Sequence, residues 1–380
     1  MLNTSQDEAK KDTTVAQKMK YYFNADTARS LGDQLGIDGA EYAKWVAPRV
    51  DDLEILDRVT VFAAGLRARL PQDYTTAVQA VVDKLGPELR EGEGYFNHSF
   101  HLWPVSRYIE LYGLDNPELS LTAIEALTRA FTGEWAVRPY LERYPDLTMR
   151  RVHAWAESES HNVRRLASEG IRPRLPWARV HTPFVADPSP IIPVLDTLAA
   201  DTSLFVRKSV ANNLNDITRT HPALALETAR RWSATYPTAE TKWLIERGVR
   251  TLIKQGHPEA LELAGFIQSD DVVLHTVDFP DRVAVGETGT LSAELKNTGR
   301  SSHELLVEYR MHFLKKHGQR RPTVFRIGKF HLSPGETLLV NKTHTFRITG
   351  TRTYYPGTQA VSVVVNGVES APRQFELTQG

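Results

Sequence analysis

The sequence predicts a mainly helical chain, a HEAT-like α-solenoid followed by an all-β sandwich of the immunoglobulin type. Three observations predict this class. Apolar residues recur at threes and fours from about residue 14 to 267, related helical stretches return about every 40 residues, and alternation with turn signals takes over after Ser269. We therefore expect a disordered N-terminus at 1–13, a helical-repeat domain at 14–268 and a sandwich domain at 269–380.

The helical part follows from the spacing of its apolar residues. In residues 53–70, LEILDRVTVFAAGLRARL, the large apolar side chains fall at helical spacing. Three later stretches look like copies of one helical pair, because Val163, Val206 and Ile245 begin similar short cores and lie 43 and 39 residues apart. A period near 40 residues with two helices per unit is typical of a HEAT-like solenoid, whose stacked units present one concave surface.

The C-terminal part follows from a different pattern. Segments such as GTLSAELKNTG, ELLVEYRMHFL and QAVSVVVNG alternate apolar and polar residues and are separated by Gly, Pro and Asn turns. Six or more such strands within about 110 residues predict an immunoglobulin-like sandwich. Because the chain has no cysteine, this sandwich lacks the disulfide that joins the two sheets of antibody domains.

The composition excludes several kinds of chemistry. The absence of cysteine removes disulfides, thiolate zinc sites, iron–sulfur clusters and cysteine nucleophiles. P-loop, HExxH and dinucleotide-binding glycine patterns are also absent, so we expect no metal and no cofactor. No run of about 20 apolar residues occurs, and the N-terminus has acidic residues where a signal peptide needs an apolar core. We expect a cytoplasmic monomer without a membrane partner.

The charges are balanced overall but unevenly distributed. The chain has 46 basic and 46 acidic side chains; residues 1–148 carry 16 and 23 of them, residues 149–256 carry 16 and 10, and residues 271–380 carry 14 and 10. A polyanion must therefore be bound by the locally basic middle of the chain. Such an asymmetry is typical of proteins that bind nucleic acids.

Three motifs in this basic region and just before it resemble one family. FTGEWAVRPYL (131–141), HNVRRLASEGIRPRLPWA (161–178) and FVRKSVANNLNDI (205–217) are similar to the AlkC branch of the AlkD-like DNA alkylation repair glycosylases, and the resemblance covers most of residues 15–267. It implies a HEAT-like fold that cradles duplex DNA and hydrolyses the N-glycosidic bond of cationic 3-methyladenine or 3-methylcytosine without base flipping, for base excision repair. Some AlkC members also carry an immunoglobulin-like tail, in agreement with residues 269–380.

The chemistry of this reaction requires negative charge beside the sugar. A cationic base leaves without a general acid, so the barrier lies in the oxocarbenium-like sugar. Glu169 and Asp216 are candidates because each lies near the end of a predicted helix, where the dipole disfavours an anion; Asp216 shares a helix face with Asn212. Glu134, at a predicted helix start, is assigned a catalytic role by the resemblance alone.

Each carboxylate also has a structural interpretation. Glu169 is spaced to pair with Arg165, four residues earlier on the helix. Asp216 is suited to a solvated helix end or a cap, and Glu134 to stabilising its own helix through the dipole.

Two tryptophans are candidates for the base or sugar contact. Trp177 follows Pro-Arg-Leu-Pro, a stiff turn that removes it from any helical stripe, so it is suited to stacking against substrate. Trp135 is a weaker candidate, as a wall of the pocket. Trp103, Trp232 and Trp243 have helical spacing and are expected in the core.

The predicted DNA contacts are basic residues of the helical pairs and of a tail hairpin loop, KKHGQRR. Basic residues at equivalent points of stacked units can follow a phosphate backbone, although some belong to solvated helix faces. Those of the helical part are Arg150, Arg151, Arg164, Arg165, Arg172, Arg174, Arg207, Lys208, Arg247, Arg250 and Lys254. Those of the tail are Lys315, Lys316, Arg320 and Arg321.

Two alternatives belong to other functional classes. One is a non-enzymatic HEAT-repeat scaffold that binds DNA or protein through its concave face, and the other is a DNA binder that has lost catalysis. Carboxylates at unfavourable helix ends speak against the scaffold, and the retention of Glu134, Glu169 and Asp216 speaks against the DNA binder, which would be structure-specific. Lys208 lies among arginine-rich helices, so it is better suited to contact a phosphate than to form a Schiff base. We therefore expect a monofunctional hydrolase.

Overall fold

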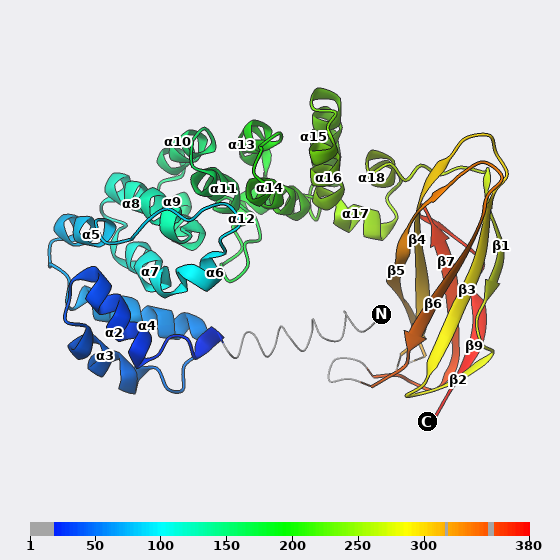
Figure 1. The fold of residues 1–380 in the computed structure, drawn as a ribbon, viewed down its shortest axis with the longest axis horizontal. Coiled ribbons are helices and arrows are strands. Elements are labelled where there is room, and N and C mark those ends of the chain that lie inside the picture. The colour runs from blue at the N-terminus through cyan, green and yellow to red at the C-terminus, as the bar shows by residue number, and fades with distance from the viewer. Residues whose placement is uncertain (1–18, 316–317, 349–352) are drawn as a thin grey trace. The chain divides into compact units, whose positions relative to one another are not determined.

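Helices form the first of two compact units, which ends at Thr220, while the last helices and all strands form the second, His221–Gly380 (Figure 1). The computed structural model describes residues 19–315, 318–348 and 353–380. The segment 1–13, predicted to be disordered, lies outside these residues.

The helices of the first unit are α2 (Ala25–Leu35), α3 (Gly39–Val46), α4 (Ile55–Arg67), α5 (Tyr74–Val82), α6 (Tyr95–His98), α7 (Trp103–Tyr112), α8 (Pro117–Ala130), α9 (Glu134–Arg143), α10 (Pro145–Ala156), α11 (His161–Glu169), α12 (Thr182–Ala186), α13 (Ile192–Leu198) and α14 (Leu204–Ile217). Short 3₁₀ turns lie at Ala47–Arg49, Phe100–Leu102 and Ser189–Ile191.

The repeat predicted from the sequence corresponds to second helices of successive helical pairs. Val163 and Val206 lie on α11 and α14, which pack against each other, and both side chains are buried. Serine side chains start these two helices: Ser160 Oγ accepts the Val163 N–H, and Ser203 Oγ accepts the Phe205 N–H. Helical pairs stacked in this way confirm the predicted α-solenoid.

The second unit contains four helices and two β-sheets. Its helices are α15 (Pro222–Thr235), α16 (Ala239–Gly248), α17 (Arg250–Gln255) and α18 (Pro258–Leu263). Its strands are β1 (Val272–Asp278), β2 (Arg282–Ala284), β3 (Thr288–Asn297), β4 (His303–Leu314), β5 (Arg320–Leu332), β6 (Thr337–Thr345), β7 (Gly357–Val365), β8 (Val368–Glu369) and β9 (Arg373–Thr378). One sheet has the order β1-β3-β6 and the other β2-β9-β7-β4-β5, with β8 beside β7.

The core of the sandwich comes from alternate residues of its strands. On β4, one buried apolar cluster includes Leu305, Val307, Tyr309, Met311 and Phe313. The alternate apolar residues seen in the sequence are therefore those that point into the core between the two sheets. The predicted class of a helical solenoid followed by a β-sandwich is confirmed.

Contacts also join the sandwich to the last helices of the second unit. Asn366 donates from Nδ2 to the Ile267 carbonyl at 2.8 Å, and Lys329 forms an ion pair with Glu246 of α16. The chain therefore changes from helix to strand near the predicted position 268/269, but α15 to α18 belong to the same compact unit as the strands. Among the residues described, no helix is long and apolar enough to cross a membrane.

Candidate active site

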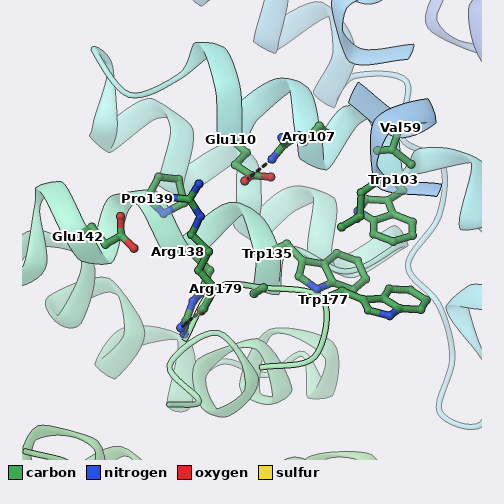
Figure 2. Close-up of a pocket in the computed structure, with 12 residues that line it drawn as sticks. Val59, Trp103, Arg107, Glu110, Trp135, Arg138, Pro139, Glu142, Trp177 and Arg179 are labelled. Atoms are coloured by element: carbon green, nitrogen blue, oxygen red, sulfur yellow. Dashed lines mark hydrogen bonds and ion pairs between the residues drawn. The ribbon is translucent and has the colours of Figure 1, made fainter. Parts of the chain in front are cut away.

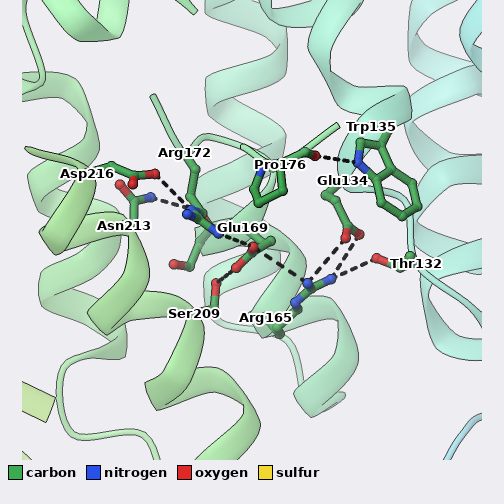
Figure 3. A network of polar contacts seen from close by, with 12 residues as sticks. Thr132, Glu134, Trp135, Arg165, Glu169, Arg172, Pro176, Ser209, Asn213 and Asp216 are labelled. Carbon is green, nitrogen blue, oxygen red and sulfur yellow. Dashed lines mark hydrogen bonds and ion pairs between the residues drawn. The ribbon is translucent and has the colours of Figure 1, made fainter. Parts of the chain in front are cut away.

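A buried row of five side chains with alternating charge lies in the first unit, and we call it the acidic row (Figure 3). Its members are Glu134, Arg165, Glu169, Arg172 and Asp216. Arg165 donates two hydrogen bonds to Glu134, with N–O distances of 2.9 and 3.2 Å, and its Nη2 lies 3.8 Å from Glu169 Oε1. Arg172 joins Glu169 to Asp216, with N–O distances of 2.6 and 2.9 Å. Each of the five residues is at most 7% exposed. The structure therefore brings the three predicted carboxylates together.

The local structure explains how each carboxylate is placed. Glu134 is the first residue of α9, where the helix dipole favours a negative charge. Glu169 is the last residue of α11, and Asp216 is one residue from the end of α14, where the dipole disfavours an anion. Arg165 and Arg172 offset this cost. The predicted pairing of Glu169 with Arg165 is present, but its contact with Arg172 is shorter.

The surroundings give the three carboxylates different proton affinities. Burial raises the pKa of Glu134 and that of Asp216, although Arg165 and Arg172 oppose the rise. Burial alone would also raise the pKa of Glu169, but the two arginine charges and the hydrogen bond from Ser209 outweigh it and hold that pKa below its ordinary value. Glu169 is thus the most firmly ionised carboxylate of the row.

Neutral side chains complete the row. Ser209 Oγ donates to Glu169 Oε2 at 2.6 Å, and Thr132 Oγ1 accepts from Arg165 at 2.7 Å. Asn213 Nδ2 donates to the Ser168 carbonyl at 2.8 Å. Asn213, which the sequence analysis missed, is fully buried here, whereas the predicted Asn212 is only half-buried. Helical spacing relates both asparagines to Ser209 and Asp216, by three and four residues for Asn212 and by four and three for Asn213, so it does not distinguish them.

Three tryptophans form a stack that begins at Trp135, the residue after Glu134. Trp177 is 45% exposed and has a φ of 59° in the left-handed region. Its ring lies nearly parallel to that of Trp103, with centroids 5.3 Å apart, and Trp103 in turn stacks on Trp135 at 4.5 Å. Trp103 is buried, as expected of a core residue, but it also forms this aromatic wall with the two predicted tryptophans.

The aromatic wall borders a cavity of about 320 Å³ in the first unit (Figure 2). Arg107 and Glu110 form an ion pair on another side of the cavity, and Glu142 of α9 lies away from the tryptophans. Arg138, also on α9, lines the cavity between these groups. None of these four charged residues was singled out by the sequence analysis.

Comparisons with known proteins place this geometry in a family. Residues 274–379 match the family model described as the C-terminal Ig-like domain of the uncharacterised protein YhaZ. The uncharacterized protein YhaZ of Bacillus subtilis (strain 168) is 37% identical over 327 residues, which are 86% of this chain and 88% of that protein. The solved structure of the Pseudomonas fluorescens alkylpurine DNA glycosylase AlkC, bound to DNA containing an abasic site analog, has 32% identity and a TM-score of 0.82. The match covers 94% of this chain and 99% of the AlkC chain.

The chain belongs to the AlkC family. The family predicted from three sequence motifs is thereby confirmed, together with its solenoid fold and its immunoglobulin-like C-terminal domain. Within the described residues, no group of three or more His, Asp or Glu side chains is placed to hold a metal ion.

Two predicted DNA contacts of this AlkC-family chain need correction. Arg165 and Arg172 were expected to contact phosphates, but both guanidinium groups are buried and paired with carboxylates of the acidic row. A phosphate cannot reach them without displacing Glu134, Glu169 or Asp216. Their role in the structure is to compensate buried negative charge.

Arg164 and Arg207 also bind protein groups. Arg164 donates from Nε and Nη2 to the carboxylate of Asp201, at 2.6 and 3.1 Å, and from Nη1 to two carbonyls of the preceding loop. Arg207 Nη1 donates to the carbonyls of Asp201 and Thr202, both at 2.8 Å. These equivalent positions of two repeats therefore share one task, which is to hold the loop before their helix.

The remaining predicted cations differ in their surroundings. Arg151 donates to Thr122 Oγ1, Arg250 to the Arg247 carbonyl and Arg320 to the Thr358 carbonyl. Arg247 lies over the Trp243 ring, and Arg174 is half-buried. The exposed ones are Arg150, Lys208, Arg250, Lys254, Lys315 and Arg320. Lys316 and the side chain of Arg321 lie outside the described residues, although the backbone of Arg321 pairs in β5.

Proposed function

We propose that the chain is a DNA glycosylase that hydrolyses the N-glycosidic bond of alkylated bases in duplex DNA, as a step of base excision repair. The observation that carries this proposal is the buried row in which Glu134, Glu169 and Asp216 pair with Arg165 and Arg172, together with the aromatic wall that begins at Trp135, the residue after Glu134. The similarity to the solved structure of the Pseudomonas fluorescens alkylpurine DNA glycosylase AlkC supports the same reaction class.

The charge balance of the row suits the transition state. Within the row itself, three carboxylates outnumber two guanidinium groups by one charge, and water is largely excluded. Arg138 and Arg219 act on Asp216 from outside the row. A carboxylate about 4 Å from a developing oxocarbenium ion contributes about 4 kcal/mol at an effective dielectric constant of 20. The arginines keep the carboxylates ionised and aligned, so that one of them can also orient the attacking water.

The substrate follows from the same electrostatics. A base alkylated at N3 carries a positive charge, so it is attracted by the acidic row and by the face of Trp177, and it leaves without a general acid. We propose 3-methyladenine and 3-methylcytosine as substrates, excised without base flipping. No lysine belongs to the described acidic row, which supports a monofunctional hydrolase. The exposed Arg150 and Lys208 are candidates for phosphate contacts in a cytoplasmic monomer.

A base-release assay tests the proposal. The purified chain is incubated with duplex DNA methylated by an alkylating agent, and released bases are separated by chromatography. We expect free 3-methyladenine or 3-methylcytosine and an abasic strand that stays unbroken until it is treated with alkali. If the chain binds this DNA and releases nothing, the non-enzymatic scaffold is the correct assignment.

The rate of base release is expected to fall as the pH is lowered. The fall is expected to begin at a higher pH than the one at which exposed carboxyl groups take up protons. Burial raises the pKa of Glu134 and that of Asp216, so both take up a proton sooner than exposed carboxyls do, and each proton removes a negative charge from the row. Single-turnover rates measured across acidic and neutral pH, with DNA kept saturating, check this. A rate that stays constant down to pH 4 would contradict an essential ionised Glu134 or Asp216.

A further inference from the structure

The segment between α11 and α12 carries two side chains of the proposed site but has little regular structure of its own. Arg172, which joins two carboxylates, and Trp177, which is exposed and stacks on Trp103, both belong to residues 170–181. The left-handed backbone of Trp177 is uncommon for a residue with a side chain and costs about 1–2 kcal/mol. Contacts from elsewhere must therefore hold this segment in place.

One buried guanidinium group makes most of those contacts. Arg138 of α9 donates from Nη1 to the carbonyls of Arg172 and Gly170, at 2.7 and 3.4 Å, and from Nη2 to the carbonyl of Arg179 at 3.0 Å. Arg138 is only 7% exposed. The carbonyls of Gly170 and Arg172 lie at the start of the segment, and the carbonyl of Arg179 lies near its end. One side chain therefore holds both ends of the segment.

The same helix supplies a second bond to the segment. Trp135 Nε1 donates to the Pro176 carbonyl at 3.1 Å, next to Trp177. Glu134, Trp135 and Arg138 are thus all on α9, and the last two tie the Trp177 segment to the helix that carries the first carboxylate.

We propose that Arg138 is a positioning residue for base excision: its guanidinium group sets the ring of Trp177 in register with the carboxylates of the acidic row. The inference rests on the proposed glycosylase function. Arg138 makes no direct contact with Glu134, Glu169 or Asp216 among the hydrogen bonds described, so it acts through the segment it holds. Burial lowers the pKa of Arg138 to about 10, which leaves the group charged at neutral pH.

A lysine at this position separates charge from shape. Lysine keeps the positive charge but presents a single ammonium group, which cannot span carbonyls that a planar fork reaches together. We expect Arg138→Lys to lower the single-turnover rate of base release on the order of 100-fold, the size that a displacement of about 1 Å produces. The affinity for undamaged duplex DNA is expected to stay within about threefold, because phosphate contacts lie elsewhere.

The chain offers a matched control. Arg58 of α4 is also buried, and it donates to three carbonyls, those of Leu53 at 2.8 Å, Phe23 at 3.2 Å and Asp51 at 2.8 Å. None of these residues belongs to the proposed site. Arg58→Lys is expected to lower the melting temperature about as much as Arg138→Lys does and to leave the rate of base release near that of the parent chain.

A double variant tests whether Arg138 acts through Trp177. If it does, Trp177→Ala removes the group that Arg138 positions, so the variant with both changes is expected to be no slower than the slower single variant. Should the two effects multiply, or should Arg138→Lys release bases at the parental rate, the inference is wrong. A parent chain that releases no base overturns the proposed function instead.

A variant with a milder change covers a failure of Arg138→Lys to fold. Trp135→Phe keeps an aromatic ring in the wall and removes the hydrogen bond to Pro176 together with part of the stacking surface on Trp103. We expect it to slow base release in the same way, by about tenfold, because one of the bonds on the same segment is lost. An unchanged rate in a folded Trp135→Phe chain contradicts the need to hold this segment.

Discussion

Replacing Glu169 by Gln is expected to lower the single-turnover rate of base release by about three orders of magnitude. Glu169 has its pKa held below the ordinary value, so it is fully ionised at neutral pH, and the change removes one whole charge. About 4 kcal/mol of stabilisation of a cationic sugar at 4 Å corresponds to that factor. Glutamine keeps the shape of the side chain, but its single amide oxygen can accept from only one of Ser209 and Arg172, which now donate to the two carboxylate oxygens.

The affinity for DNA separates this effect from a loss of binding. Because Glu169 is buried and does not contact phosphate, Glu169→Gln is expected to bind undamaged duplex as the parent chain does. Glu157, an exposed acidic residue directly after α10, provides the control: Glu157→Gln is expected to leave both rate and affinity unchanged. Parental excision by both Glu169→Gln and Asp216→Asn would remove the catalytic roles assigned here.

Local signals explain why the helix ends that hold the carboxylates could be predicted from sequence, whereas the role of Glu134 came from the family resemblance alone. Gly170 ends α11 directly after Glu169, and the Thr132-Gly133 pair precedes the start of α9 at Glu134. Such boundaries depend on neighbouring residues alone, so the sequence contains them. The alternation of the β4 residues likewise predicted which of them face the core of the sandwich.

The partners of the arginines could not be predicted, because they depend on contacts between distant helices. Nothing near Arg165 in the sequence indicates that its guanidinium group meets Glu134 of α9, and Arg172 similarly meets Asp216 of α14. Basic residues in a basic region suggest phosphate contacts. The folded chain instead uses these two to compensate buried carboxylates, and it uses Arg138 to hold a segment.

The aromatic wall shows the same limit. Helical spacing correctly predicted that Trp103 is buried, but burial and participation in a site are compatible when a side chain lies between the core and a cavity. The stack of Trp103 on both Trp135 and Trp177 joins α7, α9 and the segment after α11, which no sequence period relates.

Replacing Arg172 by Met is expected to destabilise the fold by about 3–5 kcal/mol at neutral pH, since it leaves Glu169 and Asp216 buried without their shared cation. The loss depends on pH in a defined direction. Without Arg172, we expect the pKa of Glu169 in the folded chain to rise above its value in the unfolded chain, and the pKa of Asp216, which is already raised, to rise further. The folded variant is then favoured at low pH, and its stability decreases as the pH rises through those raised values.

Urea unfolding of Arg172→Met and of the parent chain at several pH values measures this difference, which is expected to shrink as the medium becomes acidic. Adding Glu169→Gln to Arg172→Met should recover part of the stability at neutral pH, because one uncompensated charge disappears. If Arg172 were a phosphate contact, as its place in a basic region suggests, Arg172→Met would unfold like the parent chain. It would instead flatten the dependence of log affinity on log salt by about 0.9.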